Sequence, residues 1–349
     1  GGQTTGQGGG GTADEEGTIH AAISYELSTN GYDPMTTTAA LTKHRRGHAL
    51  RPRQPTHQEH LMLRGNTTTK LENKAGGRFT GFRSVSTASK IAMAVLALVG
   101  LATLFAPLLS TYDPLASGTP VQPPGAEHWF GTDEYGRDLF ARVMYGARYS
   151  MAIGIGSVGF GLIVGTILGS IAGFYGGKAD DIIMRGIDIF CSIPNILKAV
   201  VIVSLLGTST INLIIALAIS CATNYARIVR ASVMTVRDLE YVESSYAMGL
   251  PTWKIILRHI LPNCLSPIIV QTTLLIGTTI ISASSLSFLG IGVPAPAPEW
   301  GALLSGGRGH IRDASYICVI PGLAIMFTVL ALNLLGDGLR DALDPKLKK

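Results

Sequence analysis

The chain has 349 residues, of which 47% are hydrophobic and 15% are charged, and its formal net charge is +5 at pH 7. Soluble domains carry roughly 25% charged residues, so a chain of this length has too few charges to cover a water-facing surface. The composition excludes a soluble multidomain protein and a chain that is disordered throughout, and it favours the lipid bilayer as the surrounding solvent.

Residues 1–90 form a polar, basic tail that begins with a glycine-rich stretch and holds 11 of the 28 Lys and Arg residues. Few apolar positions recur at a regular spacing, so we expect a mostly disordered segment on the cytoplasmic side of the membrane. His57 and His60 do not form an HExxH pattern, and the tail has no recognisable nucleic-acid-binding motif. We therefore expect it to contact membrane lipid, and to bind neither a metal nor a nucleic acid.

Six apolar runs follow, each of about 20 residues, which is the length needed to cross roughly 30 Å of hydrocarbon. Backbone polar groups in lipid must be satisfied within their own segment, so these runs are predicted to be helices. Residues 91–349 are therefore predicted to form an all-α membrane domain with six transmembrane helices. The predicted spans are 91–111, 151–175, 188–207, 211–231, 268–289 and 316–335.

The placement of Lys and Arg predicts the orientation of these spans. If the N-terminus is inside, the inside segments hold 22 Lys and Arg residues, counting Arg227 and Arg230 at the inner end of the fourth run, and the outside segments hold five, with Lys198 inside the third run. Without the tail the ratio is still 11 to five. Because inside loops carry the excess of positive charge, we predict a multi-pass protein of the cell (inner) membrane with both termini in the cytoplasm.

The second run carries a glycine at every fourth position. A glycine has no Cβ, so another helix can approach its backbone closely. We interpret the repeat as a tight helix-packing face, within one bundle or across a dimer; the alternative is the general glycine richness of membrane helices. The four glycines are Gly161, Gly165, Gly169 and Gly173.

Several polar side chains fall within the predicted spans, where contact with lipid is unfavourable. The fifth run is rich in hydroxyls, which a translocation path along this helix would explain; hydrogen bonds between helices are the alternative. Lys198 either faces such a path or extends its charge to the membrane surface. The candidate path residues are Thr272, Thr278, Thr279, Ser282 and Lys198.

The loop 238–262, predicted to be cytoplasmic, has the pattern of two short amphipathic helices with a break between them. Gly249 can adopt a positive φ and end the first helix, and Pro251 suits the first turn of the second. Pro262 is expected to stop the second helix. Small residues beside the break suit the docking of this helix–turn–helix knob (residues 238–262) into a groove of a partner.

The knob resembles the E-A-A-x3-G-x9-I-x-L-P motif of ATP-binding cassette importer permeases. The residues in register are Glu243, Gly249, Leu261 and Pro262, whereas Ser244 and Ser245 replace the two alanines and His259 replaces the isoleucine. Both serines are small, so the shape of the motif is kept.

Two further regions resemble the dipeptide/oligopeptide subfamily of these permeases. The segment 131–138 is similar to its G-T-D-x-x-G-R-D motif outside the first helix. The C-terminal pattern is similar to that of its "C" subunit, and it comprises Leu289-Gly290-Ile291-Gly292, Glu299-Trp300-Gly301 and residues 336–345. The resemblance covers residues 91–349, and it departs from the family at Ala283, where relatives commonly carry Glu.

The resemblance implies the fold of a type I importer permease and the function of a permease subunit in an ATP-driven dipeptide or oligopeptide importer that works by alternating access. It also implies four kinds of partner: a homologous permease, two ATPase subunits that use ATP and Mg, an extracytoplasmic peptide-binding protein, and membrane lipid. The residues that would make or shape the contact with the ATPase are Glu243, Ser244, Ser245, Gly249, Trp253 and Lys254.

The chain itself lacks a Walker A pattern, G-x4-G-K-[ST], because the nearest fragment, residues 176–179, has neither the first glycine nor the hydroxyl. We therefore expect a non-catalytic subunit that binds no cofactor. Its four cysteines are widely spaced and form no CxxC pair, so no metal site is indicated.

Three alternatives remain open at the level of sequence. A permease of the same subfamily could import nickel or another small solute, because selectivity rests largely with the binding protein. An intramembrane enzyme would need paired catalytic groups inside the spans, and the histidines lie outside them. A channel or membrane scaffold would have no need of the knob.

Overall fold

The computed structural model of the chain describes residues 86–343, and the predicted disordered tail lies almost wholly outside this range. Within the described residues the regular elements are helices, apart from one isolated bridge between Thr132 and Asp138. The predicted all-α class is confirmed.

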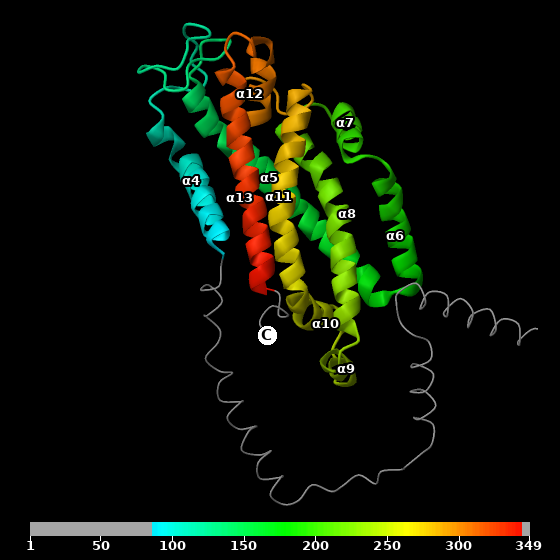
Figure 1. Ribbon diagram of the computed structural model, residues 1–349. Coiled ribbons are helices and arrows are strands. Elements are labelled where there is room, and N and C mark those ends of the chain that lie inside the picture. Colours follow the sequence, from blue (N-terminus) through cyan, green and yellow to red (C-terminus); the bar gives the residue numbers. More distant parts are fainter. Residues whose placement is uncertain (1–85, 344–349) are drawn as a thin grey trace, which may run out of the picture. The chain divides into compact units, whose positions relative to one another are not determined.

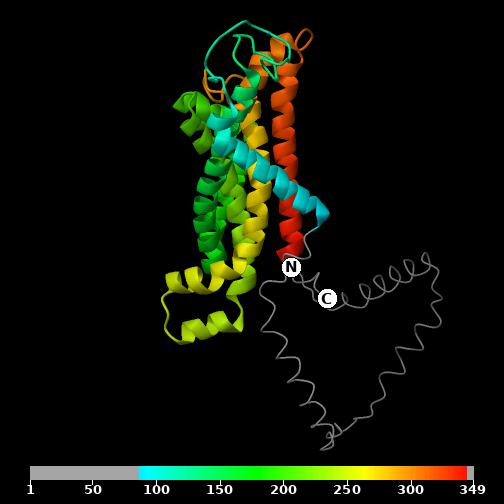
Figure 2. The ribbon, with the colours of Figure 1, turned by 90° about the vertical axis from the view of Figure 1, so that its left-hand side faces the viewer.

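Five helical segments of the described chain are long and apolar enough to cross a membrane, and a bent pair of helices supplies a sixth span. The spans are α4 (Thr87–Leu109), α5 (Leu139–Tyr175), the pair α6 (Gly177–Ser192) and α7 (Asn195–Leu206), α8 (Thr210–Arg237), α11 (Leu265–Phe288), and α13 (Tyr316–Leu343). They form one bundle, in which α4 crosses the other helices obliquely (Figures 1 and 2).

The two ends of the bundle carry different elements. Loop 110–138 and the short helix α12 (Trp300–Gly307) lie at one end, which we call the cap end (Figure 1). The short helices α9 (Glu240–Ala247) and α10 (Thr252–Ile255) lie at the other, the knob end. The first turn of α4 and the last turn of α13 also lie at the knob end (Figures 1 and 2).

The prediction of a single helix over 188–207 is wrong. The chain is helical from Gly177, breaks at Ile193 and Pro194, and turns by 89° between α6 and α7. Proline disfavours helical geometry in the residue before it, and Ile193 is extended, with φ −92° and ψ 131°. The segment 176–187, expected to be a loop, is therefore most of α6.

The sequence predicted that Pro262 stops the second helix of the knob, and this prediction is wrong. The chain passes from α10 through a π-helical turn (Ile256–Ile260) and a 3-10 turn (Leu261–Cys264) directly into α11. Proline lacks an N–H and clashes with the preceding turn, and a local change of helical pitch accommodates both effects. The knob is therefore continuous with the membrane helix α11.

Candidate functional site

The knob has the helix–break–helix geometry that its glycine allows. Gly249 has φ +74°, its N–H donates to Tyr246 O at 2.8 Å, and the N–H of Leu250 donates to Ser245 O at 3.3 Å. These two bonds form a Schellman motif, which ends α9 and satisfies its last carbonyls. A Cβ at Gly249 would meet no atom of the described residues within 4 Å. Position 249 therefore requires a glycine because of its positive φ, and not because neighbouring atoms crowd it.

Buried apolar side chains attach the knob to the membrane helices. Val242 of α9 and Ile255 of α10 are fully buried in one cluster with Val229 and Val233 of α8. The ring of Tyr246 also stacks on Phe174, in the last turn of α5, with centroids 6.0 Å apart. The knob is thus packed closely against both α5 and α8.

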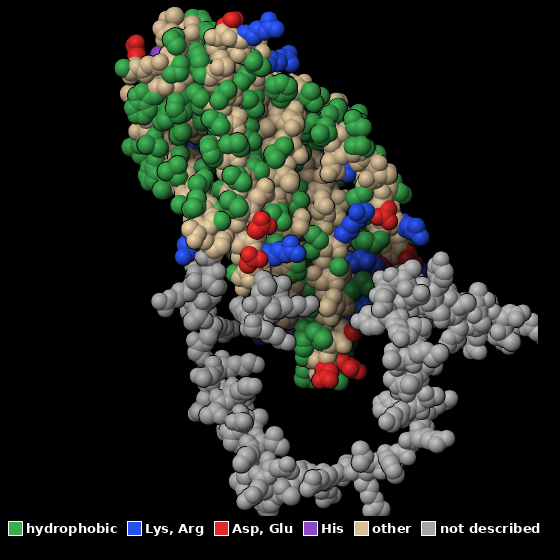
Figure 3. Space-filling model, viewed as in Figure 1, with side chains coloured by type: hydrophobic (Ala, Val, Ile, Leu, Met, Phe, Trp, Pro, Cys, Tyr) green, Lys and Arg blue, Asp and Glu red, His purple; other side chains and the backbone are tan. Residues whose placement is uncertain are grey.

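The outward surface of the knob combines apolar and acidic side chains. Met248 is 71% exposed and Trp253 is 64% exposed, while the acidic Glu240 and Glu243 lie in the first turn of α9. Figure 3 shows hydrophobic and acidic side chains together at the tip. Contiguous exposed apolar side chains are typical of protein interfaces.

The remaining knob residues of the sequence prediction have different positions. Ser244 is exposed, Lys254 is partly buried, and Ser245 is only 1% exposed. The hydroxyls of both serines donate to carbonyls of the preceding turn, on Glu240 and Tyr241, at 2.8 Å. Ser245 therefore shapes the knob from inside, whereas Ser244 lies on its surface.

The four glycines of α5 lie against α8. A Cβ at Gly161, Gly165, Gly169 or Gly173 would come within 2.5–3.0 Å of a carbonyl oxygen of α8, and the carbonyls belong to Ala218, Ala222, Ala226 and Arg230 in that order. Both series repeat every four residues, so the two backbones stay in contact over three helical turns. This contact fixes α8, and through it the knob, relative to α5.

Three of the five candidate path residues line one small cavity. The cavity has a volume of about 90 Å³ and lies between α7, α8 and α11. The polar residues that line this cavity are Asn195, Ser220, Asn224, Thr278, Thr279 and Ser282. We call the surface formed by these six residues the polar face. In Figure 3 the surface over α8 and α11 is largely tan, whereas hydrophobic side chains cover α4 and α13.

The other two candidates lie apart from this cavity. Thr272 accepts a 2.7 Å hydrogen bond from the Tyr225 hydroxyl and donates to Ile268 O, so it joins α8 to α11. Lys198 is 5% exposed, and its Nζ has no hydrogen-bond partner among residues 86–343. Because α7 lies in the cap-end half of the bundle (Figure 1), this side chain does not extend its charge to the knob-end surface.

The cap end contains charged residues whose burial the sequence did not predict. Asp133 and Arg142 are each 4% exposed and pair at 3.3 Å, and Arg137 donates to the same carboxylate at 2.8 Å. Glu299 is fully buried and accepts a 3.2 Å bond from the Ser150 hydroxyl and a 3.5 Å bond from that of Ser284. This carboxylate is the N-cap of α12, where it also accepts from the backbone N–H of Ala302 at 2.9 Å.

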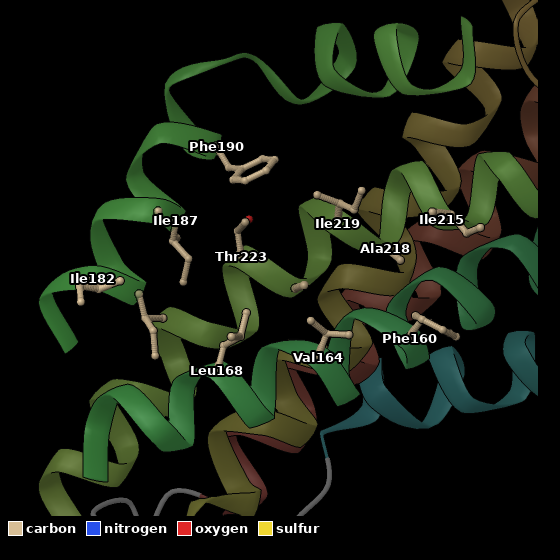
Figure 4. Close-up of a pocket in the computed structure, with 13 residues that line it drawn as sticks. Phe160, Val164, Leu168, Ile182, Ile187, Phe190, Ile215, Ala218, Ile219 and Thr223 are labelled. Atoms are coloured by element: carbon tan, nitrogen blue, oxygen red, sulfur yellow. The ribbon is translucent and has the colours of Figure 1, made fainter. Parts of the chain in front are cut away.

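A larger cavity of about 390 Å³ lies between α5, α6 and α8 (Figure 4). Its lining is apolar except for Thr223, whose hydroxyl already donates to Ser220 O. It therefore offers little to bind a polar solute. Among residues 86–343 there is also no group of three or more His, Cys, Asp or Glu side chains placed to hold a metal ion.

The chain is similar in sequence to known proteins of one family. Residues 165–349 match the family described as binding-protein-dependent transport system inner membrane component. The chain is 48% identical, over 72% of its length and 86% of the relative's, to the dipeptide transport system permease protein DppC of Alkalihalophilus pseudofirmus. It is 48% identical, over 68% and 77% of the two lengths, to the glutathione transport system permease protein GsiD of Pectobacterium atrosepticum.

Two further similarities extend the comparison. The probable D,D-dipeptide transport system permease protein DdpC of Escherichia coli is 39% identical over 82% of this chain and 98% of its own. Among solved structures, an inward-facing form of the MetNI methionine ABC transporter is similar over 58% of this chain and 96% of that one, with 19% identity and a TM-score of 0.49.

Proposed function

The chain belongs to the family of binding-protein-dependent transport system inner membrane components, and we propose that it is the permease subunit of an ATP-driven importer of short peptides. The observation that carries the substrate class is the 48% identity, over 72% of the chain, to a dipeptide permease. The names of the other two relatives refer to a D,D-dipeptide and to glutathione, which is itself a tripeptide. The chain is a multi-pass protein of the inner membrane.

In this proposal the knob is the contact with a separate ATPase subunit. Its exposed Met248 and Trp253 would enter a cleft of that subunit, and Glu243 would face basic groups at the rim of the cleft. Ser244 and Lys254 would lie at the edge of the contact, while Ser245 and Gly249 hold the shape of the knob. Two ATPase subunits would serve the complete transporter and supply both ATP and Mg.

The polar face would line the translocation path opposite a homologous permease subunit. Its hydroxyls and amides can replace water around a peptide, which apolar helix surfaces cannot do. Because the knob packs on α8 and α5, closure of the ATPases would tilt these helices and shift the path between inward- and outward-facing states. Lipid would cover the apolar outer surfaces.

The cap end would then face outward and receive the extracytoplasmic peptide-binding protein. A cleft of about 790 Å³ lies there, lined by residues from 115–142 and 287–317, among them Asp133, Arg137 and Arg308. With the knob end in the cytoplasm, both ends of the described chain lie on the cytoplasmic side. This orientation agrees with the Lys and Arg bias of the sequence.

The proposal is tested by uptake in cells with and without this chain, using labelled dialanine and nickel as alternative solutes. We expect dialanine uptake to require the chain and nickel uptake to be unaffected. Loss of nickel uptake alone would contradict the peptide assignment.

The coupling role is tested with Gly249→Trp, which we expect to insert normally but to lose ATPase binding and transport. A matched control is Gly290→Trp, because Gly290 also has a positive φ and open space around its Cβ position but follows α11 at the cap end. This control should retain ATPase binding. If Gly249→Trp binds the ATPase and transports normally, the knob is not the coupling element.

A further inference from the structure

Two ion pairs connect α6 to α8, and they differ in exposure. Arg230 and Asp180 form a two-pronged pair in which the arginine side chain is 31% exposed and the aspartate 14%. Arg227 and Asp188 share a single bond at 2.7 Å, and their side chains are 49% and 59% exposed. The first pair is a structural clamp, whereas the second keeps much of its bonding capacity unused.

The hydrogen-bonding groups of Arg227 and Asp188 that remain available can be named atom by atom. One guanidinium nitrogen of Arg227 donates to Oδ1 of Asp188, and neither side chain forms another hydrogen bond or ion pair among the described residues. The remaining N–H groups of Arg227 can therefore donate to a carboxylate, and Oδ2 of Asp188 can accept from an ammonium group.

The exposed pair continues the polar face towards the knob. Asn224, which lines the polar cavity, and Arg227 lie three residues apart on α8 and are both exposed. Side chains at this spacing share one face of a helix, about 4.5 Å apart along its axis. Figure 3 shows basic and acidic side chains together over α6 and α8, next to the tan surface.

The depth of the pair indicates what surrounds it. Arg227 lies 17 residues after Thr210, or about 25 Å along α8 from its cap-end start. If the hydrocarbon layer of roughly 30 Å begins at Thr210, Arg227 lies near its knob-end edge. Ionisable groups inside a span face a protein interior, a water-filled cavity or the membrane surface, since lipid cannot solvate them. About half of each side chain is exposed, so the pair is free to face a water-filled path between this subunit and a partner permease.

We propose that Arg227 and Asp188 form a binding station for zwitterionic solutes, with Arg227 taking the carboxylate and Asp188 the ammonium group. This inference rests on the proposed function, and it names two residues that would recognise the substrate inside the path. A short peptide carries both charges at neutral pH, because α-carboxyl and α-amino groups titrate near pH 3.5 and about pH 8. When the peptide binds, its carboxylate replaces Asp188 as the partner of Arg227, and its ammonium group replaces Arg227 as the partner of Asp188. No charge is therefore left unpaired.

The test compares three solutes in vesicles containing the complete transporter: dialanine, N-acetyl-dialanine without the ammonium group, and dialanine amide without the carboxylate. Arg227→Gln should reduce dialanine uptake about tenfold, the effect of one charge-assisted contact, and should leave the amide at the wild-type rate. Asp188→Asn should reduce dialanine uptake similarly and leave the N-acetyl peptide unchanged.

Two controls separate binding from structure. Arg185→Gln removes an exposed cation of α6 that forms no ion pair among residues 86–343, so all three solutes should be transported as by wild type. The double variant Arg230→Gln/Asp180→Asn removes the structural clamp, so it should lower the unfolding temperature and slow all three solutes alike. Arg227→Gln should leave the unfolding temperature within about 2 °C of wild type, as surface substitutions usually do.

A second measurement does not need the peptide-binding protein. A cysteine placed at Asn224, with Cys191 and Cys318 replaced by serine, reports occupancy of the path through protection from a water-soluble thiol reagent. In the complex that carries only these three cysteine changes, dialanine should protect the cysteine at position 224 at a lower concentration than dialanine amide does. With Arg227→Gln the two concentrations should become equal.

The outcomes distinguish this inference from the proposed function. Equal losses for all three solutes, unchanged uptake in both variants, or unchanged discrimination in the labelling assay would overturn the binding station while leaving the importer intact. If wild-type vesicles take up no dialanine, the proposed function itself has failed.

Discussion

Gly165 of α5 lies so close to Ala222 of α8 that a Cβ on the glycine would come within 2.5 Å of the alanine carbonyl oxygen. The same position would also meet the Cβ of Tyr225 at 2.5 Å. No rotamer relieves these contacts, because the obstructing atoms belong to the backbone or lie next to it.

Gly165→Val should therefore separate the two helices and destabilise the fold by about 1–3 kcal/mol, as overpacked cores do. Thermal unfolding of the purified protein in detergent measures the effect. Gly159→Val is the matched control, because a Cβ at Gly159 of the same helix meets no described atom within 4 Å. Equal unfolding temperatures for the two variants would mean that α5 and α8 are not in close contact.

Asp133→Asn should destabilise the cap end. The substitution removes the carboxylate that pairs with Arg137 and with the buried Arg142. Breaking a buried pair by removing one partner costs about 3–5 kcal/mol, since the other charge is left uncompensated. Proteolysis of loop 110–138 in intact vesicles should become faster. The exposed Glu127 forms no ion pair among the described residues, so Glu127→Gln should leave the proteolysis rate unchanged.

Trp253→Ala should weaken the binding of the ATPase subunit about 30-fold, which corresponds to about 2 kcal/mol for an aromatic interface anchor. The fold should be unaffected, because 64% of this side chain is exposed. Titration of the purified permease with the ATPase measures the affinity. Trp129→Ala is the control, since Trp129 is 66% exposed at the cap end. An equal effect of both substitutions would exclude Trp253 as a contact residue.

The orientation of the bundle gives a further prediction. A cysteine at Ala247, in the knob, should react with a membrane-impermeant thiol reagent only when the reagent is inside the cell. A cysteine at Ala126, in the cap-end loop, should react only from outside. Both positions are exposed, so reactivity reports the side of the membrane. The reverse pattern would place the knob out of reach of a cytoplasmic ATPase and would end the importer proposal.

Several features of this protein follow from its sequence alone. The length and apolarity of six runs determine the membrane class, because lipid demands a continuous helix of about 20 residues. The break in the knob was also predictable: Gly249 can occupy a positive φ at low cost, and the conformation depends only on its neighbours. The glycines of α5 indicated close helix packing by their spacing.

Other features were decided only by the tertiary structure, because they depend on residues far apart in the chain. The sequence could not name α8 as the helix that meets the glycines, nor place the buried Glu299 beside Ser150 and Ser284. It misplaced the third span because a proline break inside an apolar run does not change the hydropathy of the run. Arg227 and Asp188 lie 39 positions apart, and α6 and α8 bring them together with half of each side chain still exposed.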